Sequence, residues 1–297
     1  MLDSEDEADR KNYLVFESSD EFEKFLKRKI SPTVENGVEY CTLERYPANR
    51  ILFTAEHAQT KKLMMRELGP KAYVGIGDTN TDILAKLGAY YLRSAYIVPL
   101  FIRTEADASR SPEDLGKGLR LFVKPLYAKQ KTTYVPIHTN ASMLPQLMKY
   151  HQTIEKLDPS AIISVHGISV KRENDLIFGF GEDFKCIGGK KEAFKFKDEF
   201  TNHLDSVFNK QGVRESLKIK VSTWGFTGSQ NYVLTKHVVE HNKSVRDPKN
   251  KRIGIQLELN WRGRAAENDY GIPTTSYQLL IQALGDFMFR WKTDMAK

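Results

Sequence analysis

The chain has 297 residues, of which 40% are hydrophobic and 28% charged, so it is long enough to bury a sizeable core without disulfide bonds. Its two cysteines, Cys41 and Cys186, exclude the disulfide-rich scaffolds of small secreted proteins. No apolar run approaches the ~20 residues of a membrane-spanning helix, and the acidic start MLDSEDEADRK has no apolar signal-peptide core. We therefore expect a cytoplasmic protein with no membrane partner.

The 45 basic and 38 acidic residues give a formal net charge of +7 and a pI near 9.1. A basic protein attracts nucleic acids or small anionic substrates. The basic residues gather at 185–197 and 243–252, and neither stretch has the regularly interleaved aromatics of a base-stacking surface, although Phe194 and Phe196 lie in the first. Solvated helix and loop faces explain both stretches, so a small anionic molecule is favoured as the partner over a nucleic acid.

The chain begins with residues 1–11, which have the composition of a disordered acidic tail. Ser18 and Glu21 then fit a capping box, which predicts a short helix that ends near Ile30.

From about residue 50, short apolar runs alternate with amphipathic stretches. We predict strands at 51–53, 96–98, 161–165 and 253–260, and helices at 79–91, 143–157, 190–209 and 274–291. This alternation favours an α/β fold, a three-layer sandwich in which helices flank a mostly parallel mixed sheet. Since no linker divides the middle, residues 49–297 are predicted to form one α/β catalytic domain and residues 1–48 an N-terminal extension.

Three of the predicted strands end in polar residues that can do chemistry. His57 and His166 each follow an apolar run, and Glu258 lies near the end of the last strand. Sites in open α/β sheets gather outside the carboxyl ends of the strands, and two histidines with a carboxylate suit a catalytic zinc ion, which keeps one position open. The alternatives are hydrogen-bonded structural histidines and a glutamate on a solvent-facing side of its strand.

A third ligand has to come from elsewhere, because Thr60 stands three residues after His57 where a carboxylate would be useful. The nearest candidates are Asp78 and Asp82, at a predicted helix start. Asp78 as an ordinary N-cap and Asp82 as a first-turn acid are the alternative interpretations.

Two further residues are candidates for substrate binding. Arg110 lies in a polar loop, where it can grip a substrate carboxylate or pair with nearby acids. His151 lies in the predicted helix 143–157, as a substrate contact or as a structural histidine.

Six short segments follow one another along the chain: TAEHA (54–58), DTNTD (78–82) leading into LGA (87–89), DASR (107–110), YHQT (150–153), SVHG (164–167) and IQLEL (255–259). In this order they resemble the N-formylglutamate amidohydrolase family, which is related to the zinc carboxypeptidases. The resemblance covers roughly residues 50–262.

The resemblance implies that His57 and His166 bind one zinc ion per chain, with Asp78 as the third ligand. It also implies that Glu258 is the general base and that Arg110 binds the substrate carboxylate or stabilises the oxyanion. His151 lies in the matching YHQT segment and is assigned to substrate binding.

The sequence departs from the family in three places. Ser109, assigned to substrate binding with Arg110, replaces the asparagine that usually precedes the arginine, and residues 224–229 lack an expected arginine and Gly-Gly pair. Residues 1–48 have no counterpart in the family, so specificity for glutamate is not assumed.

The resulting hypothesis is a metal-dependent amidohydrolase of an N-acyl amino acid or small acidic peptide. The alternatives are a binding protein on the same scaffold and, less favoured, a nucleic-acid-associated protein. The oligomeric state and any contact of His138 with the site stay open.

Overall fold

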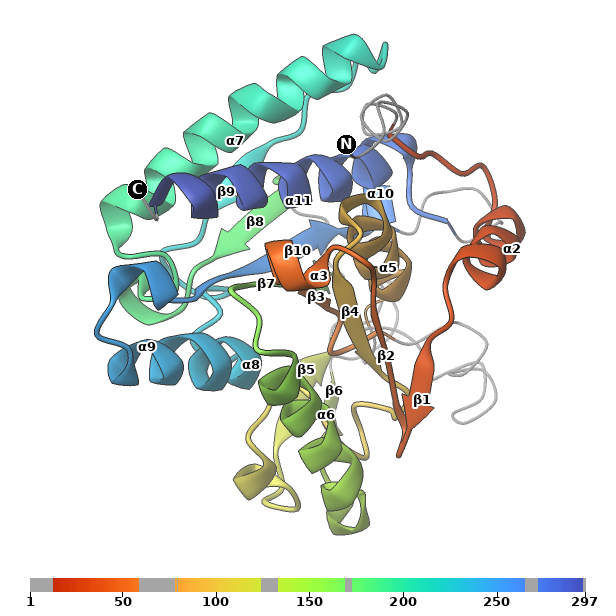
Figure 1. Cartoon of the computed structure of the whole chain (residues 1–297). Coiled ribbons are helices and arrows are strands. Elements are labelled where there is room, and N and C mark those ends of the chain that lie inside the picture. The colour runs from red at the N-terminus through yellow and green to blue at the C-terminus, as the bar shows by residue number, and fades with distance from the viewer. Residues whose placement is uncertain are drawn as a thin grey trace.

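The computed structural model describes residues 13–58, 78, 80–123, 133–168, 173–264 and 272–295 (Figure 1). The predicted disordered tail at residues 1–11 lies outside the described residues.

An eight-stranded mixed sheet forms the centre of the molecule, with the strand order β1-β2-β4-β3-β7-β10-β8-β9. Its strands are β1 (Thr33–Glu35), β2 (Val38–Thr42), β3 (Ile51–Thr54), β4 (Ala95–Pro99), β7 (Ala161–Ile168), β8 (Leu176–Gly179), β9 (Ile219–Val221) and β10 (Ile253–Asn260). The central strands β4, β3, β7 and β10 run parallel, whereas β2 and β8 join this group antiparallel. A separate hairpin consists of β5 (Arg120–Val123) and β6 (Thr133–Pro136).

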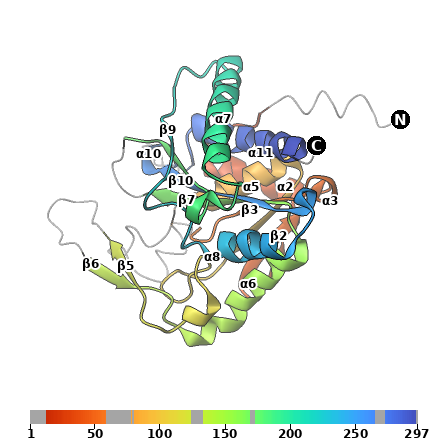
Figure 2. The ribbon, with the colours of Figure 1, turned by 90° about the vertical axis from the view of Figure 1, so that its left-hand side faces the viewer.

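Helices cover both faces of the sheet, as Figure 2 shows in edge view. One layer contains α2 (Ser19–Lys29), α5 (Thr81–Leu92), α7 (Lys190–Lys210) and α11 (Thr275–Met295). The other contains α6 (Leu144–Leu157), α8 (Tyr232–Leu234), the π-helical turn Thr235–Glu240 and α9 (His241–Ser244), while α3 (Tyr46–Asn49) and α10 (Trp261–Arg264) are short connecting helices. This arrangement confirms the predicted three-layer α/β fold with a mixed sheet.

The central strands are apolar because helices cover them on both sides. Every residue of β10 is buried, including Gln256, Glu258 and Asn260, which alternate with leucine and isoleucine. The alternative that Glu258 faces solvent is therefore wrong: β10 lies between β7 and β8 and has no exposed face.

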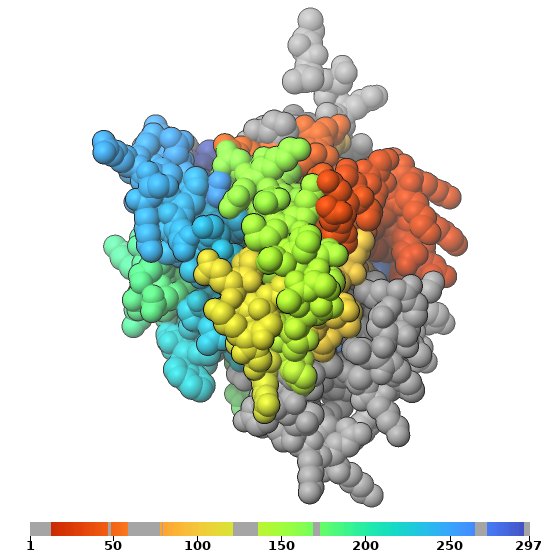
Figure 3. All heavy atoms as spheres, turned by 90° about the horizontal axis from the view of Figure 1, so that it is seen from below, coloured from red at the N-terminus to blue at the C-terminus, as the bar shows by residue number. Residues whose placement is uncertain are grey.

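Two apolar cores lie on opposite sides of the sheet. The larger joins the sheet to α5, α7 and α11. The smaller joins it to α6 and α8 and includes Leu52 of β3, Ile162 of β7 and Leu147 of α6. Figure 3 shows this second side from outside, with α6 (green) between the segment that contains α8 and α9 (blue) and the N-terminal strands β1 and β2 (red).

The described part of the N-terminal region packs onto the same body. Its strands β1 and β2 extend the main sheet through β4. The backbone groups of Leu14 and Phe16 hydrogen-bond to the side-chain amides of Gln282 and Gln278 on α11. The predicted helix is confirmed as α2, whose N-cap Ser18 accepts from the N–H of Glu21. The division at residue 48 stays a prediction.

Within the described residues, none of the helices has both the length and the apolar composition that crossing a bilayer requires.

Candidate metal centre

A buried polar layer lies at the carboxyl ends of β3, β7 and β10. Thr54 is opposite Ser164, Ser164 is opposite Gln256, and His166 is opposite Glu258. Because residues two apart on a strand share a face, these side chains lie on the face that α6 and α8 cover.

His57 and Asp78 approach this layer from the loops beyond the strands. His57 follows β3, and its carbonyl accepts a hydrogen bond of 2.8 Å from the N–H of Asp78. The N-cap of α5 is Asn80, in the left-handed conformation at φ 64°, so the interpretation of Asp78 as an ordinary N-cap is wrong. The turn at Asn80 leaves the Asp78 carboxylate facing the histidines. Asp82 lies in the first turn of α5, outside the group that Asp78 joins.

Three ligand atoms from His57, Asp78 and His166 converge on one point. The two Nδ1 atoms are 3.1 Å apart, and Asp78 Oδ2 lies 3.3 Å from His57 Nδ1 and 3.4 Å from His166 Nδ1. A tetrahedral zinc ion with bonds of about 2.0–2.1 Å separates its ligand atoms by about 3.3 Å. These three distances therefore fit the edges of one face of a zinc tetrahedron, and the three residues are at most 9% exposed.

The outer nitrogen of His57 faces a carboxylate. Its Nε2 lies 2.8 Å from Oδ1 of Asp107, which is fully buried. Because an ionised carboxylate only accepts hydrogen bonds, Nε2 carries the proton and Nδ1 keeps a free lone pair for the metal. Burial raises the pKa of Asp107, but the charges of Arg103 and His57 outweigh it and hold this pKa well below its usual value.

The outer nitrogen of His166 also faces a carboxylate. Its Nε2 lies 3.2 Å from Oε2 of Glu56 and 3.0 Å from Oγ of Ser164. The other Glu56 oxygen accepts from the hydroxyl groups of Thr54 (2.7 Å) and Ser164 (2.8 Å). Carboxylates in this position orient metal-bound histidines. Sequence reasoning missed both Glu56 and Asp107 as functional residues, although each stands in a segment that the resemblance had singled out.

Glu258 lies beside His166, where a general base is expected. It is 5% exposed, and its Oε1 accepts a 2.6 Å hydrogen bond from Nε2 of Gln256. Burial, partly offset by the charge of His166, raises the pKa of Glu258. A raised pKa brings a carboxylate closer to the pH at which proton transfer is most effective.

Ser109 and Arg110 lie next to the His57–Asp107 pair. The Ser109 hydroxyl is 3.0 Å from His57 Nε2 and 2.7 Å from Asp107 Oδ1, so it contacts the outer side of His57. The Arg110 side chain is 26% exposed, with Nε 3.9 Å from Asp107 Oδ2 and one terminal nitrogen donating to Gln230 Oε1. His138 supports the same loop, because its Nδ1 accepts from the Asp107 N–H.

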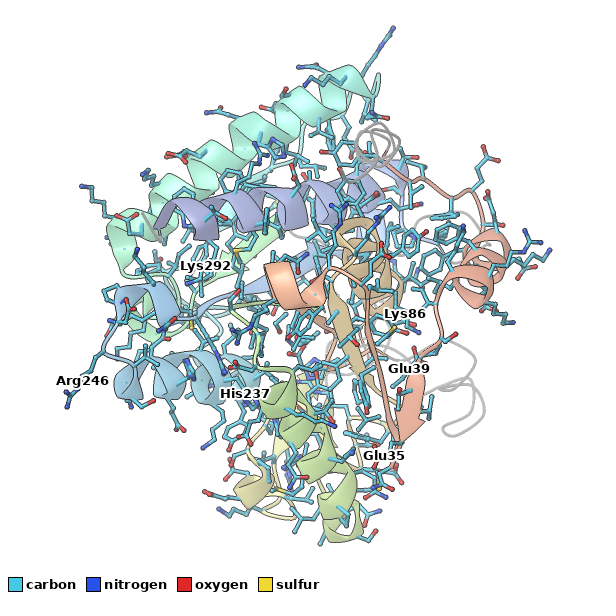
Figure 4. The ribbon with its side chains drawn as sticks, viewed as in Figure 1. Glu35, Glu39, Lys86, His237, Arg246 and Lys292 are labelled. Atoms are coloured by element: carbon cyan, nitrogen blue, oxygen red, sulfur yellow. The ribbon has the colours of Figure 1, made fainter. Side chains whose placement is uncertain are left out.

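His151 lies deeper, on α6. Its Nδ1 is 3.2 Å from Nε2 of His237, and its ring packs edge-on against Tyr232. Figure 4 shows His237 on the helical segment beside α6. The structure thus brings His57, Asp78, His166 and Glu258 together, places Ser109 and Arg110 beside them, and places His151 in a separate histidine pair.

The fold and these side chains define an α/β protein with a buried His–His–Asp group suited to a divalent cation. No family model matches the sequence, and a search of curated proteins finds no match.

Solved structures similar to this chain include one that bears the name of the family expected from the motifs. N-formylglutamate amidohydrolase from Ralstonia eutropha JMP134 aligns over 88% of this chain and 98% of its own, with 12% identity and a TM-score of 0.48. A metallo-carboxypeptidase from Burkholderia cenocepacia aligns over 92% and 68%, with 10% identity and a TM-score of 0.42. Murein-tripeptide amidase from Escherichia coli O157 aligns over 83% and 85%, with 10% identity and a TM-score of 0.41. These similarities are distant, with identities of 10–12%.

Proposed function

We propose that the protein is a metal-dependent hydrolase that cleaves the amide bond of an N-acyl amino acid or small acidic peptide. The observation that carries this proposal is the convergence of His57 Nδ1, His166 Nδ1 and Asp78 Oδ2 within 3.1–3.4 Å of one another, beside a buried glutamate. These three residues would hold one zinc ion per chain. A zinc ion there would lower the pKa of a bound water and polarise the substrate carbonyl.

The protein's own residues supply the proton transfers. Glu258 accepts a proton from the attacking water and then gives it to the leaving amine, a role that its raised pKa favours. Asp107 and Glu56 would hold the rings of His57 and His166 in the orientation that turns their Nδ1 atoms towards a bound cation.

The position of Arg110 favours a substrate with a negative charge. The guanidinium lies at a partly exposed position beside Asp107 and Gln230, where it can bind the substrate carboxylate in bidentate fashion. This contact would hold the amide in a fixed orientation for attack.

The first test is the metal content of untagged protein, measured by plasma mass spectrometry. We expect about one zinc ion per chain, lost in His57→Ala and retained in His203→Ala, a histidine outside the group. Protein with zinc is then assayed for amine release from N-formyl and N-acetyl amino acids. No metal after zinc is added back would contradict the hydrolase and favour a binding protein on the same scaffold.

A further inference from the structure

Asn231 hydrogen-bonds both to the start of a helix and to the polar side chains next to Glu258 and His166. It is the N-cap of α8, and its Oδ1 accepts a 3.0 Å hydrogen bond from the N–H of Val233. A backbone N–H can only donate, so the amide oxygen of Asn231 must face Val233. The Asn231 NH2 group is therefore directed into the buried polar layer, where the side chain is 3% exposed.

The first connection leads to Glu258. Nδ2 of Asn231 donates to Oε1 of Gln256 at 3.0 Å, and this contact fixes the Gln256 amide with its own NH2 group towards Glu258. Nε2 of Gln256 then donates to Oε1 of Glu258 at 2.6 Å. The Gln256 amide thus holds Oε1 of Glu258 as a hydrogen-bond acceptor.

The second connection leads to His166. The other Asn231 N–H donates to Oγ of Ser164 at 2.9 Å. Since Ser164 accepts there, its single proton goes to Glu56, 2.8 Å away. Nδ2 of Asn231 also lies 3.2 Å from Nε2 of His166, but its two protons are used on Ser164 and Gln256. The proton on Nε2 of His166 is therefore directed to Glu56. Nδ1 of His166 then faces His57 and Asp78.

We propose that Asn231 is a positioning residue that fixes the hydrogen-bond direction of Gln256 towards Glu258 and of Ser164 towards Glu56. This inference rests on the proposed function only for the roles of Glu258 and His166. The direction of the hydrogen bonds is a property of the chain itself and can be measured without substrate.

Asn231→Asp tests the proposal with almost no change in shape. One carboxylate oxygen still accepts from Val233, but the group that faces Gln256 becomes an acceptor. The Gln256 amide must then turn its NH2 group away from Glu258. The probe is the NMR signal of the Gln256 side-chain NH2 group in protein labelled with 15N-glutamine. A short hydrogen bond to a carboxylate shifts one of its two protons downfield of other glutamine side-chain amides. The signal is assigned to Gln256 by its absence in Gln256→Leu. We expect this signal in the wild type and its loss in Asn231→Asp.

The matched control is Asn140→Asp. Asn140 is also an N-cap, accepting from the N–H of Ser142 on an exposed turn far from Gln256 in sequence. The control should keep the Gln256 signal. If Asn231→Asp keeps it too, or if Asn140→Asp loses it, the proposal is overturned.

Asn231→Ser covers the case in which Asn231→Asp does not fold. Serine is also a good N-cap, but it lacks the amide donors, so the Gln256 amide is free to turn. We expect a weakened and broadened signal, and a signal identical to the wild type would reject the proposal. Zinc content is measured on the same samples. A wild type that has the downfield signal but no zinc would contradict the proposed hydrolase and support the role of Asn231. A wild type that has zinc but no downfield signal would support the hydrolase and contradict the role of Asn231.

Discussion

At the scale of single residues, the candidate centre depends on which nitrogen of each histidine faces inwards. Buried carboxylates lie against Nε2 of both His57 and His166, so both rings present Nδ1 to the same point. The sequence predicted these two histidines and Glu258 because each lies at or just past the end of a predicted strand. It could not predict the roles of Glu56 and Asp107, because the contacts of Glu56 depend on the pairing of β3 with β7 and those of Asp107 on how the loop after β4 folds against His57.

The role of Glu258 predicts a separation of metal binding from turnover. In Glu258→Gln, the amide oxygen can still accept from Gln256, so the packing is kept while the proton acceptor is lost. We expect zinc content near one per chain and turnover of an N-acyl amino acid at least about 100-fold lower. Turnover close to the wild type would remove Glu258 from the role of base. Glu182→Gln, at an exposed surface glutamate, serves as the control.

The orienting role of Asp107 predicts a weaker metal site. Asp107→Asn keeps the shape but removes the charge that His57 and Arg103 share. We expect zinc affinity, measured by competition with a chelator, to fall about 10- to 100-fold. Asp114→Asn, on the exposed 3-10 turn after Ser111, should leave the affinity unchanged. Equal affinities in the two variants would contradict the orienting role.

At the scale of elements, the sequence predicted long, periodic segments well and short ones poorly. The helices α5, α6, α7 and α11 and the central strands fall close to the predicted ranges. The strands β8 and β9 were missed, since each has only three or four residues and pairs with a strand distant in sequence. The hairpin of β1 and β2, joined by Asn36 and Gly37, was missed as well. Asp78 illustrates the same limit at the site, because its direction depends on the left-handed turn at Asn80.

The contact between α5 and β3 gives an element-scale prediction. A Cβ at Gly88 would lie 2.5 Å from the ring of Phe53, so only glycine allows this close approach. We expect Gly88→Ala to lower the free energy of unfolding by about 1–3 kcal/mol through overpacking, measured by urea denaturation. A shift of α5 would also move Asp78, which immediately precedes the helix, and so weaken zinc binding. An unchanged free energy of unfolding would show that the Phe53 ring can move aside without loss of stability.

At the scale of the whole molecule, the pair formed by His151 and His237 couples stability to pH. Burial lowers the pKa of His151 to about 3, and burial together with the charge of His151 lowers the pKa of His237 to about 2. In the unfolded chain the pKa of each of these histidines is ~6.5. At a pH between the folded and unfolded pKa values, the unfolded chain binds more protons than the folded one. The contribution of the two neutral histidines to the free energy of unfolding is therefore fully present above about pH 6.5 and is lost as the pH falls.

This coupling predicts a loss of about 2 kcal/mol per histidine at pH 5 relative to neutral pH. In His237→Gln, one of the two contributions is absent. We expect the free energy of unfolding, measured in urea between pH 6.5 and 5, to fall less steeply than in the wild type, by about 1 kcal/mol per pH unit. Parallel curves for the two proteins would contradict the neutral buried pair.

The position of β10 has a consequence for the order in which the molecule can assemble. β7 and β8 are close in sequence, yet β10, formed from residues 253–260, lies between them. A ribosome makes β7 and β8 well before β10, and in the finished sheet these two strands lie about 10 Å apart with β10 between them. Until β10 arrives, the two strand edges that pair with it stay unpaired, and such edges promote aggregation. Since the same strand brings Glu258, a nascent chain that can already gather His57, Asp78 and His166 still lacks its base, and activity would begin only when the sheet is closed.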